Sequence, residues 1–302
     1  MEVPVGPPLI RNDFELRWGA ATSTGKVRRL NEDAMLAQPG VFVVADGLGG
    51  HAAGDVASRL TIDAFADIVT GDALDIEVIA LVVEDANARV RTHARENGQE
   101  GMGATVVGVL LVDNAGEDSL VVFNVGDARC YQLRNNRLSQ LTTDHSLVQE
   151  MVDRGELLAS QARSHPQRNV VTRAIGVESS VSADFVVAVT DTSFRLLLCS
   201  DGVHGELSDD RLADLLRSTE HPEVVARSLV EAVLEGRAPD NATALVIDVV
   251  WRPKGATSGP HDERDVTGPR PKAQTGLIQN VPTSVQSVPR AQVNLLIDEV
   301  PT

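Results

Sequence analysis

The sequence predicts an α+β fold in which antiparallel β-sheets carry helices on their outer sides. Runs typical of strands outnumber runs typical of helices, and strand-like runs follow one another without an intervening helix in residues 105–141 and 183–199. Parallel strands need a long crossover, usually a helix, whereas antiparallel strands need only a short turn. A chain of 302 residues is long enough for one large domain with a substantial core.

The individual elements follow from composition and spacing. The strand-like runs are apolar, rich in β-branched residues and bounded by Gly, Asp or Asn. In chain order they are Val41–Ala45, Thr105–Val112, Leu120–Val125, Arg129–Leu133, Ala183–Val189, Arg195–Cys199 and Ala244–Val250. Apolar residues at helical spacing predict helices at residues 53–68, 75–96, 145–153, 208–217 and 221–235.

The end of the chain differs in composition from the rest. Residues 252–302 hold half of the chain's 14 prolines and no aromatic residue, and their basic and acidic side chains nearly cancel. Such a segment does not bury a core. We therefore expect an N-terminal extension at residues 1–14, a folded domain at residues 15–251 and a disordered tail at residues 252–302. Within the tail, Val293–Ile297 is apolar enough to dock on a partner.

Charge and cysteine usage narrow the classes of function. A net charge of -16 repels the phosphate backbone of nucleic acids and the anionic surface of membranes. The longest uncharged apolar run, Ala104–Val112, is too short to span a bilayer, and the N-terminus lacks the pattern of a signal peptide. Cys130 and Cys199 lie in apolar runs, where a thiol is usually buried and free. We expect a monomeric, cytoplasmic protein that binds neither nucleic acid nor membrane.

Four aspartates stand at the ends of predicted strands. They are Asp46, Asp127, Asp201 and Asp240. A carboxylate at an apolar strand end is poorly solvated, and several together repel one another unless a cation offsets their charge. One such residue alone is more often a turn or cap residue, but four together predict a divalent metal site. Oxygen ligands without clustered His or Cys favour Mg²⁺ or Mn²⁺ over zinc.

Six short motifs in order support a more specific interpretation. They are Gly25–Asp33, Val43–His51, Gly103–Thr105, Asn124–Arg129, Cys199–Gly202 and Asp240–Thr243. Together they resemble the motif set of the metal-dependent serine/threonine protein phosphatases of type 2C, in their bacterial form, over residues 15–250. One Asp-Gly pair carries little information, whereas six motifs in the right order carry a great deal.

The resemblance has consequences for the fold. It implies two antiparallel β-sheets packed face to face and flanked by helices on both outer sides, an αββα sandwich, which agrees with the strand pattern above. It also implies a mobile flap beside the active site. The residues similar to that flap are Asp144–Ser146, His165, Pro166, Asn169 and Thr172–Gly176.

For the site, the resemblance implies two Mn²⁺ or Mg²⁺ ions that Asp46 bridges. The other implied ligands are Asp201 and Asp240 for the first ion, and the carbonyl of Gly47 with water-mediated Glu32 and Asp33 for the second. Asp127, together with Asp201, is similar to the pair that holds a weaker third ion in bacterial members.

The implied reaction is the hydrolysis of phosphoserine and phosphothreonine in proteins by a metal-bridged water, with Asp46, Asp201 and Arg28 as catalytic residues. Arg28 would bind the substrate phosphate, because a guanidinium group meets two phosphate oxygens at once. The alternative for Arg28 is a solvated surface side chain. The implied partners are phosphorylated proteins, including a serine/threonine kinase and its substrates.

One position departs from the animal members of the family, which carry a proposed general acid, a histidine, directly after the first Asp-Gly. Here that residue is Leu48, as in bacterial members, and the nearest histidine is His51. We expect His51 to cap the following helix or orient a water rather than to donate a proton. For His145 and His165, in the flap, we expect turn contacts.

Two other interpretations remain open. A catalytically weak regulatory relative would usually lack metal-binding aspartates, whereas this chain keeps Asp33, Asp46, Asp127, Asp201 and Asp240. A partner-switching phosphatase acting on anti-sigma antagonists would usually carry a fused sensor domain, for which the residues before the first motif leave little room. The sequence favours an active phosphatase over both.

Overall fold

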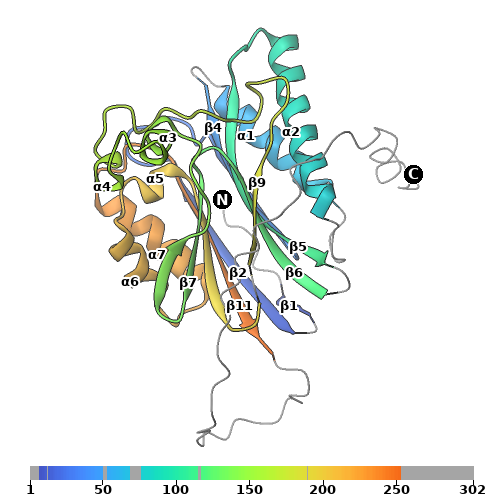
Figure 1. Ribbon diagram of the computed structural model, residues 1–302, viewed down its shortest axis with the longest axis vertical. Coiled ribbons are helices and arrows are strands. Elements are labelled where there is room, and N and C mark those ends of the chain that lie inside the picture. The colour runs from blue at the N-terminus through green and yellow to red at the C-terminus, as the bar shows by residue number, and fades with distance from the viewer. Residues whose placement is uncertain are drawn as a thin grey trace, which may run out of the picture. The chain divides into compact units, whose positions relative to one another are not determined.

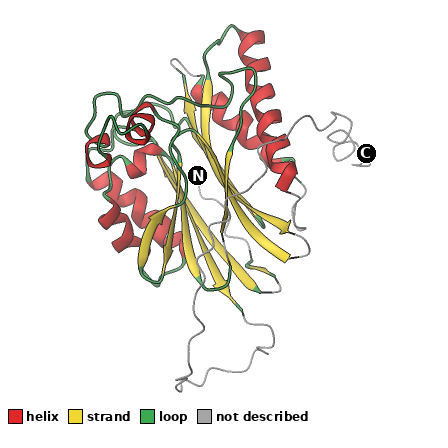
Figure 2. Cartoon of the chain, viewed as in Figure 1, coloured by secondary structure: helices red, strands yellow, loops and turns green. Residues whose placement is uncertain are grey.

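The computed structural model describes residues 7–252, except residues 12, 50–52, 69–75, 115–116 and 189. These residues form two antiparallel sheets that pack face to face between layers of helices (Figures 1 and 2). The predicted α+β sandwich is therefore confirmed. His51, the docking segment Val293–Ile297 and the rest of residues 253–302 lie outside the described residues.

The strands divide between the sheets as follows. The first sheet has the order β1-β2-β11-β10-β7-β8. Its strands are β1 Leu9–Ile10, β2 Phe14–Ser23, β7 Arg129–Arg134, β8 Arg137–Gln140, β10 Phe194–Cys199 and β11 Ala242–Trp251. The second sheet has the order β3-β4-β5-β6-β9. Its strands are β3 Asp33–Gln38, β4 Val41–Leu48, β5 Gly103–Asn114, β6 Glu117–Val125 and β9 Asp184–Ala188.

The helices cover the outer faces of the two sheets (Figure 1). α1 Gly54–Ala66 and α2 Ile76–Asn97 pack on the second sheet. α5 Asp201–His204, α6 Asp209–Leu216 and α7 Pro222–Glu235 pack on the first. Two short helices, α3 Leu147–Asp153 and α4 Ala159–Ala162, belong to the flap segment between β8 and β9.

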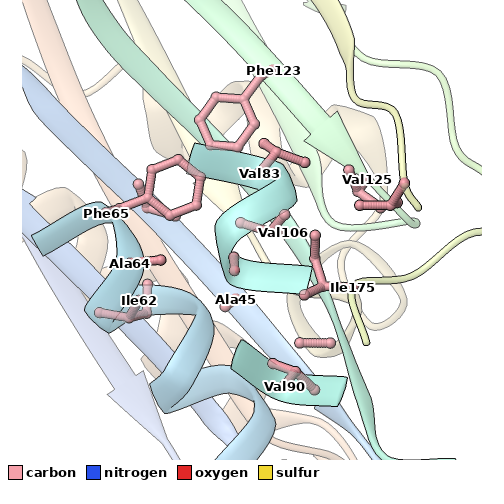
Figure 3. Close-up of a cluster of buried hydrophobic side chains, with 14 of the residues drawn as sticks. Ala45, Ile62, Ala64, Phe65, Val83, Val90, Val106, Phe123, Val125 and Ile175 are labelled. Carbon is pink, nitrogen blue, oxygen red and sulfur yellow. The ribbon is translucent and has the colours of Figure 1, made fainter. Parts of the chain in front are cut away.

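Burial on both faces explains the apolar strand sequences. In β4, Phe42 and Val44 point into the core between the sheets, whereas Val43 and Ala45 point into the core under α1 and α2. A strand that alternates between two cores reads as a continuous apolar run instead of an alternating one. Figure 3 shows the core between the second sheet and helices α1 and α2, in which the rings of Phe65 and Phe123 stack with centroids 5.0 Å apart.

The elements that the sequence pattern did not predict are short, polar or at an edge. β1, β3 and β8 are edge strands, and β2 carries two charged residues and a glycine among its apolar ones. α4 and α5 have four residues each, too few to show a period. The helix predicted at residues 145–153 begins at Leu147, because the side chain of Ser146 caps it by accepting from Gln149 N. β1 lies in the predicted N-terminal extension, yet it pairs with β2.

Both cysteines are buried and free, as expected. They lie on neighbouring strands but on opposite faces of the first sheet, because Cys130 belongs to the core between the sheets and Cys199 to the core under α6 and α7. No helix among the described residues has the length and apolar character needed to cross a bilayer.

Candidate active site

The predicted metal ligands come from both sheets and meet at one end of the sandwich. Asp33 begins β3 and pairs with Asp46 near the end of β4. Asp201 begins α5, two residues after the end of β10, and Asp240 lies just before β11, the neighbour of β10 in the first sheet. The packing of one sheet on the other therefore brings together carboxylates from distant parts of the chain.

These carboxylates perturb one another strongly. Burial raises the pKa of Asp46 well above its usual value, and the negative charges of Asp33, Asp201, Asp127 and Asp240 raise it further. Burial is also the main cause of the raised pKa values of Asp33, Asp127 and Asp201, and in each case another carboxylate of the site adds to it. The carboxyl group of Asp46 has the opposite effect on Asp201 and lowers its pKa. A bound cation would favour the ionised forms instead.

Asp33 is held in one orientation by the other sheet. Its Oδ2 accepts hydrogen bonds from Ser200 Oγ and Thr243 Oγ1, both at 2.7 Å. Thr243 Oγ1 also lies 2.7 Å from Thr22 Oγ1, which accepts from Asn31 Nδ2. The other carboxylate oxygen, Oδ1, is buried and has no hydrogen-bond partner among the described residues. A buried oxygen without a partner is costly, so Asp33 fits a site that receives a cation or its bound water.

Asn241 fixes the loop that carries Arg28. Its Oδ1 accepts from Glu32 N at 2.8 Å, and its Nδ2 donates to the carbonyls of Thr24 and Leu30 at 3.0 and 2.9 Å. One buried amide thus satisfies three backbone groups of the loop. The side chain of Asn241 therefore sets where the loop of residues 24–32 lies against the aspartates.

Gly47 and Glu32 form a second part of the site beside α1. A Cβ atom on Gly47 would lie 2.1 Å from Gly54 O, so only glycine fits there. A Cβ atom on Gly54 would lie 2.7 Å from Glu32 Oε1 and 3.0 Å from Gly47 O, so these two oxygens border one small space. Burial raises the pKa of Glu32, against the lowering effect of Arg28. A carbonyl and a carboxylate oxygen are ligands that Mg²⁺ and Mn²⁺ accept.

Arg28 lies at the rim of the site and is 47% exposed. Its Nη2 donates to Asp240 Oδ2 at 2.8 Å and its Nη1 to Glu32 Oε2 at 3.3 Å. Arg28 therefore pairs with two of the predicted metal ligands. In the arrangement that the described residues adopt, no three His, Cys, Asp or Glu side chains form a group that could hold a metal ion.

Asp127 is positioned by the turn that follows β6. Gly126 has φ +100°, and a Cβ atom there would lie 2.4 Å from Thr105 Cβ, so this turn requires glycine. His204 Nε2 lies 3.1 Å from Asp127 O. Because a carbonyl oxygen only accepts, Nε2 carries the hydrogen. Burial lowers the pKa of His204 well below its usual value, which keeps the ring neutral.

A cavity of about 410 Å³ opens beside Asp127 and Asp201, under the flap helices α3 and α4. The flap closes on itself at its base, where Leu147 N donates to Val170 O and Thr172 N donates to His145 O. The expected turn contacts of the flap histidines are confirmed. His145 Nδ1 accepts from Gly126 N at 3.0 Å, and His165 Nδ1 accepts from Gln167 N at 3.2 Å.

Sequence reasoning assigned no role to Ser200, Asn31, Asn241 or Thr243, although each stands inside a motif that it singled out. Each lies within three positions of a predicted ligand in the sequence and hydrogen-bonds another part of the site. This closeness to predicted ligands is the feature of the sequence that could have pointed to them. Their roles depend on contacts between the sheets, which the local sequence does not contain.

Comparison with known proteins agrees with this geometry. Residues 22–235 match the sequence profile of the protein phosphatase 2C family. The chain is 38% identical over 252 residues to the serine/threonine protein phosphatase PstP of Mycobacterium tuberculosis, an alignment that covers 82% of this chain and 48% of PstP. It is 34% identical over 251 residues to the serine/threonine phosphatase stp of Listeria welshimeri, covering 78% of this chain and 96% of that protein. The chain thus spans about half the length of PstP.

Solved structures show the same likeness. The crystal structure of PstP superimposes with a TM-score of 0.70 at 36% identity, covering 78% of this chain and 99% of that one. The catalytic domain of PstP in complex with two manganese ions superimposes with a TM-score of 0.68 at 35% identity, covering 78% and 98%. The matched profile spans the described domain from β2 to the end of α7, and so this chain belongs to the protein phosphatase 2C family.

Proposed function

We propose that this protein is a metal-dependent serine/threonine protein phosphatase, which hydrolyses phosphoserine and phosphothreonine in proteins. The observation that carries the proposal is the cluster around Asp46, a buried carboxylate whose pKa is raised by burial and by four neighbouring aspartates. The relatives named above are serine/threonine phosphatases, and one of them was crystallised with two manganese ions. The complete set of aspartates argues against the alternatives, a catalytically weak regulatory protein or a partner-switching protein.

The site offers carboxylate and carbonyl oxygens, which are the donor atoms that Mn²⁺ and Mg²⁺ prefer, and we assign two such ions to it. Asp46, Asp201 and Asp240 would hold the first ion, and Asp46, the Gly47 carbonyl, Glu32 and Asp33 would serve the second, the last two through water. We assign Asp127, with Asp201, to a weaker third ion. The chemistry that such ions supply is activation of the attacking water and neutralisation of charge on the phosphoryl group.

Arg28 binds the substrate phosphate in this proposal. Its guanidinium group is half exposed at the rim and already donates to Asp240 and Glu32. When these carboxylates bind metal, the same N–H groups become free for phosphate oxygens, which they meet in a bidentate arrangement. Arg28 therefore has two sets of partners, carboxylates without metal and phosphate with it.

The protein holds the remaining groups in place. Ser200 and Thr243 leave only one oxygen of Asp33 available, and Asn241 anchors the loop of Arg28. Leu48 carries no acidic or basic group, so no side chain at this position protonates the leaving alcohol. We further propose that the partners are a serine/threonine kinase and its substrates, and that the protein works in the cytoplasm as a monomer.

A metal titration with matched peptides tests the function. Protein freed of metal by a chelator should release no phosphate from a phosphothreonine peptide, and Mn²⁺ or Mg²⁺ should restore release. A phosphotyrosine peptide of the same sequence should react much more slowly. Asp214→Asn, at an exposed residue that pairs with Arg217, is a control for loss of one carboxylate and should behave as the wild type. Full activity after rigorous chelation would overturn the proposal.

A further inference from the structure

The contacts around Asp127 suggest a role for a flap histidine that does not touch the reacting atoms. His145 is buried in the base of the flap, and it contacts the turn of Asp127 through both its backbone and its ring. Its N donates to Gly126 O at 2.8 Å, and its Nδ1 accepts from Gly126 N at 3.0 Å. One residue thus satisfies both hydrogen-bonding groups of Gly126.

The hydrogen bond from Gly126 fixes the tautomer of the ring. A backbone N–H only donates, so Nδ1 of His145 is the acceptor, and in the neutral ring the hydrogen is on Nε2. Nε2 lies 3.3 Å from Asp184 Oδ2, at the start of β9, the edge strand of the second sheet. This contact does not have hydrogen-bond geometry, but the negative charge of the Asp184 carboxylate so close to Nε2 favours the tautomer with its hydrogen on Nε2 and this orientation of the ring.

Asp184 is itself held by a second flap residue. Its Oδ1 accepts from Arg173 Nη1 at 2.7 Å, and the same Nη1 donates to Ser182 O at 3.1 Å. The pKa of Asp184 is lowered to about 2, chiefly by His145 and further by Arg173. Asp184 therefore stays ionised at any pH at which the enzyme would work. A continuous line of polar contacts runs from Arg173 through Asp184, His145 and Gly126 to the predicted metal ligand.

We propose that His145 is a positioning residue for Asp127, and that Asp184 holds the ring of His145 in the tautomer and orientation this role needs. The two buried histidines then hold the Asp127 turn through different backbone groups, His145 through Gly126 N and His204 through Asp127 O. The role concerns the weaker third ion and so rests on the proposed function. Groups that orient metal ligands typically contribute about 10- to 100-fold to metal affinity or activity.

The test measures Mn²⁺ binding by calorimetry alongside phosphate-ester hydrolysis. Loss of the His145 ring, in His145→Ala, should weaken the low-affinity Mn²⁺ phase by about 10-fold or more and leave the tight phase unchanged. His145→Asn places an oxygen near the position of Nδ1, so it should recover most of this loss. Asp184→Asn should produce a smaller weakening, and combined with His145→Ala it should add nothing, because its effect passes through the missing ring.

His165→Ala is the matched control, because His165 lies in the same flap and accepts the same kind of hydrogen bond, from Gln167 N. It should leave both Mn²⁺ phases unchanged. Asp127→Asn should abolish the low-affinity phase, which would assign that phase to the ion bound by Asp127. Calorimetry needs no turnover, so a wild type that binds Mn²⁺ in two phases without hydrolysis would overturn the proposed function and not this inference.

Three results would overturn the inference. They are a wild type without a low-affinity phase, a His145→Ala variant that binds like His165→Ala, and a His145→Asn variant that recovers nothing although it melts like the wild type. If His145→Ala does not fold, Asp184→Asn decides, because its side chain is 52% exposed and its loss leaves the core intact. An unchanged low-affinity phase in Asp184→Asn would then contradict the proposal.

Discussion

Strands β10 and β11 carry buried charge at both of their ends, and the two ends are built in opposite ways. At one end, Arg195 pairs across the strands with Asp248 through Nε at 2.5 Å and Nη2 at 2.8 Å. The same guanidinium group donates to three carbonyls, one at the end of α6 and two in the α6–α7 connection. At the other end, Asp201 and Asp240 face further carboxylates. Buried charge with a full set of partners supports the fold, whereas buried charge of one sign indicates a ligand.

The largest expected effect is on turnover, at the carboxylate end of β10 and β11. The variants Asp46→Asn and Asp201→Asn test it. Each change removes one charge from the carboxylate cluster, so turnover should fall by about three orders of magnitude or more. The melting temperature without metal should stay the same or rise, because repulsion within the cluster decreases. Kinetics with Mn²⁺ and thermal melts with a chelator measure the two effects. A large fall in the melting temperature would show that these residues support the fold.

Arg195→Ala should have the opposite profile. It leaves the partly buried Asp248 without its partner and frees three carbonyls, so the free energy of unfolding should fall by about 3 kcal/mol. Mn²⁺ affinity should not change, because the pair lies at the far end of the strands. Denaturant unfolding measures the loss. The double variant Arg195→Met with Asp248→Leu removes both charges and should be destabilised less than Arg195→Ala; equal losses would contradict this account of the pair.

Arg28→Ala should affect substrate binding and not the metal. A hydrogen bond to a charged group contributes about 1.5–3 kcal/mol, so the Michaelis constant for a phosphate ester should rise by about 10-fold or more. Mn²⁺ affinity should not weaken, because Arg28 pairs with Asp240 and Glu32 in place of a metal. The neighbouring Arg29→Ala, at an exposed residue, is the control. A Michaelis constant unchanged by Arg28→Ala would refute the phosphate role.

The pH dependence of stability offers a finer comparison. A carboxylate with a raised pKa in the folded state binds more protons folded than unfolded, so its contribution is lost as pH rises from the unfolded pKa through the folded one. Asp46, Asp33, Asp127 and Asp201 all have raised pKa values. Chelated wild type should therefore lose stability as pH rises across this window.

The variant Asp46→Asn isolates this effect, because its melting temperature should depend less on pH than that of the wild type. His204 has the opposite effect, because its lowered pKa makes folding less favourable as the pH falls below the usual pKa of histidine. Both proteins carry His204, so its contribution cancels when their profiles are compared. Saturating Mn²⁺ should flatten the wild-type profile, since the metal favours the ionised carboxylates. Identical slopes for the two proteins without metal would contradict the raised pKa of Asp46.

The contrast between the two ends also shows what the sequence could predict. β4 was predictable because a strand buried on both faces reads as a continuous apolar run. α1 was predictable because a helix buried on one face carries apolar residues at helical spacing. The ligands of the site were predictable because Asp46 and Asp201 follow apolar runs in the sequence. The hydrogen bonds of Ser200 and Thr243 to Asp33 were not, because they depend on how one sheet lies on the other. β3, which carries Asp33, is a partly exposed edge strand without an apolar pattern.

The smallest expected effect concerns the place where the domain ends. Glu15 of β2 is 3% exposed and pairs with Arg17 and with Arg252, the last described residue. Arg252 N also donates to Asp13 O at 2.7 Å, so the chain just beyond β11 is tied to the start of β2. Arg252→Ala leaves Glu15 with Arg17, and the free energy of unfolding should fall by only about 1 kcal/mol.

Two truncations sharpen this last prediction. A chain that ends at Pro253 keeps Arg252, and we expect it to retain the full stability and the full turnover on a small phosphate ester. A chain that ends at Trp251 loses both the guanidinium group and the bond to Asp13, so it should melt at a slightly lower temperature and turn over at the same rate, because Glu15 is not among the residues of the site. Arg237→Ala, at an exposed arginine, controls for loss of one positive charge. If ending the chain at Pro253 abolished turnover, the predicted dispensability of the tail would be wrong, and the boundary of the working domain would lie beyond the pair of Glu15 and Arg252.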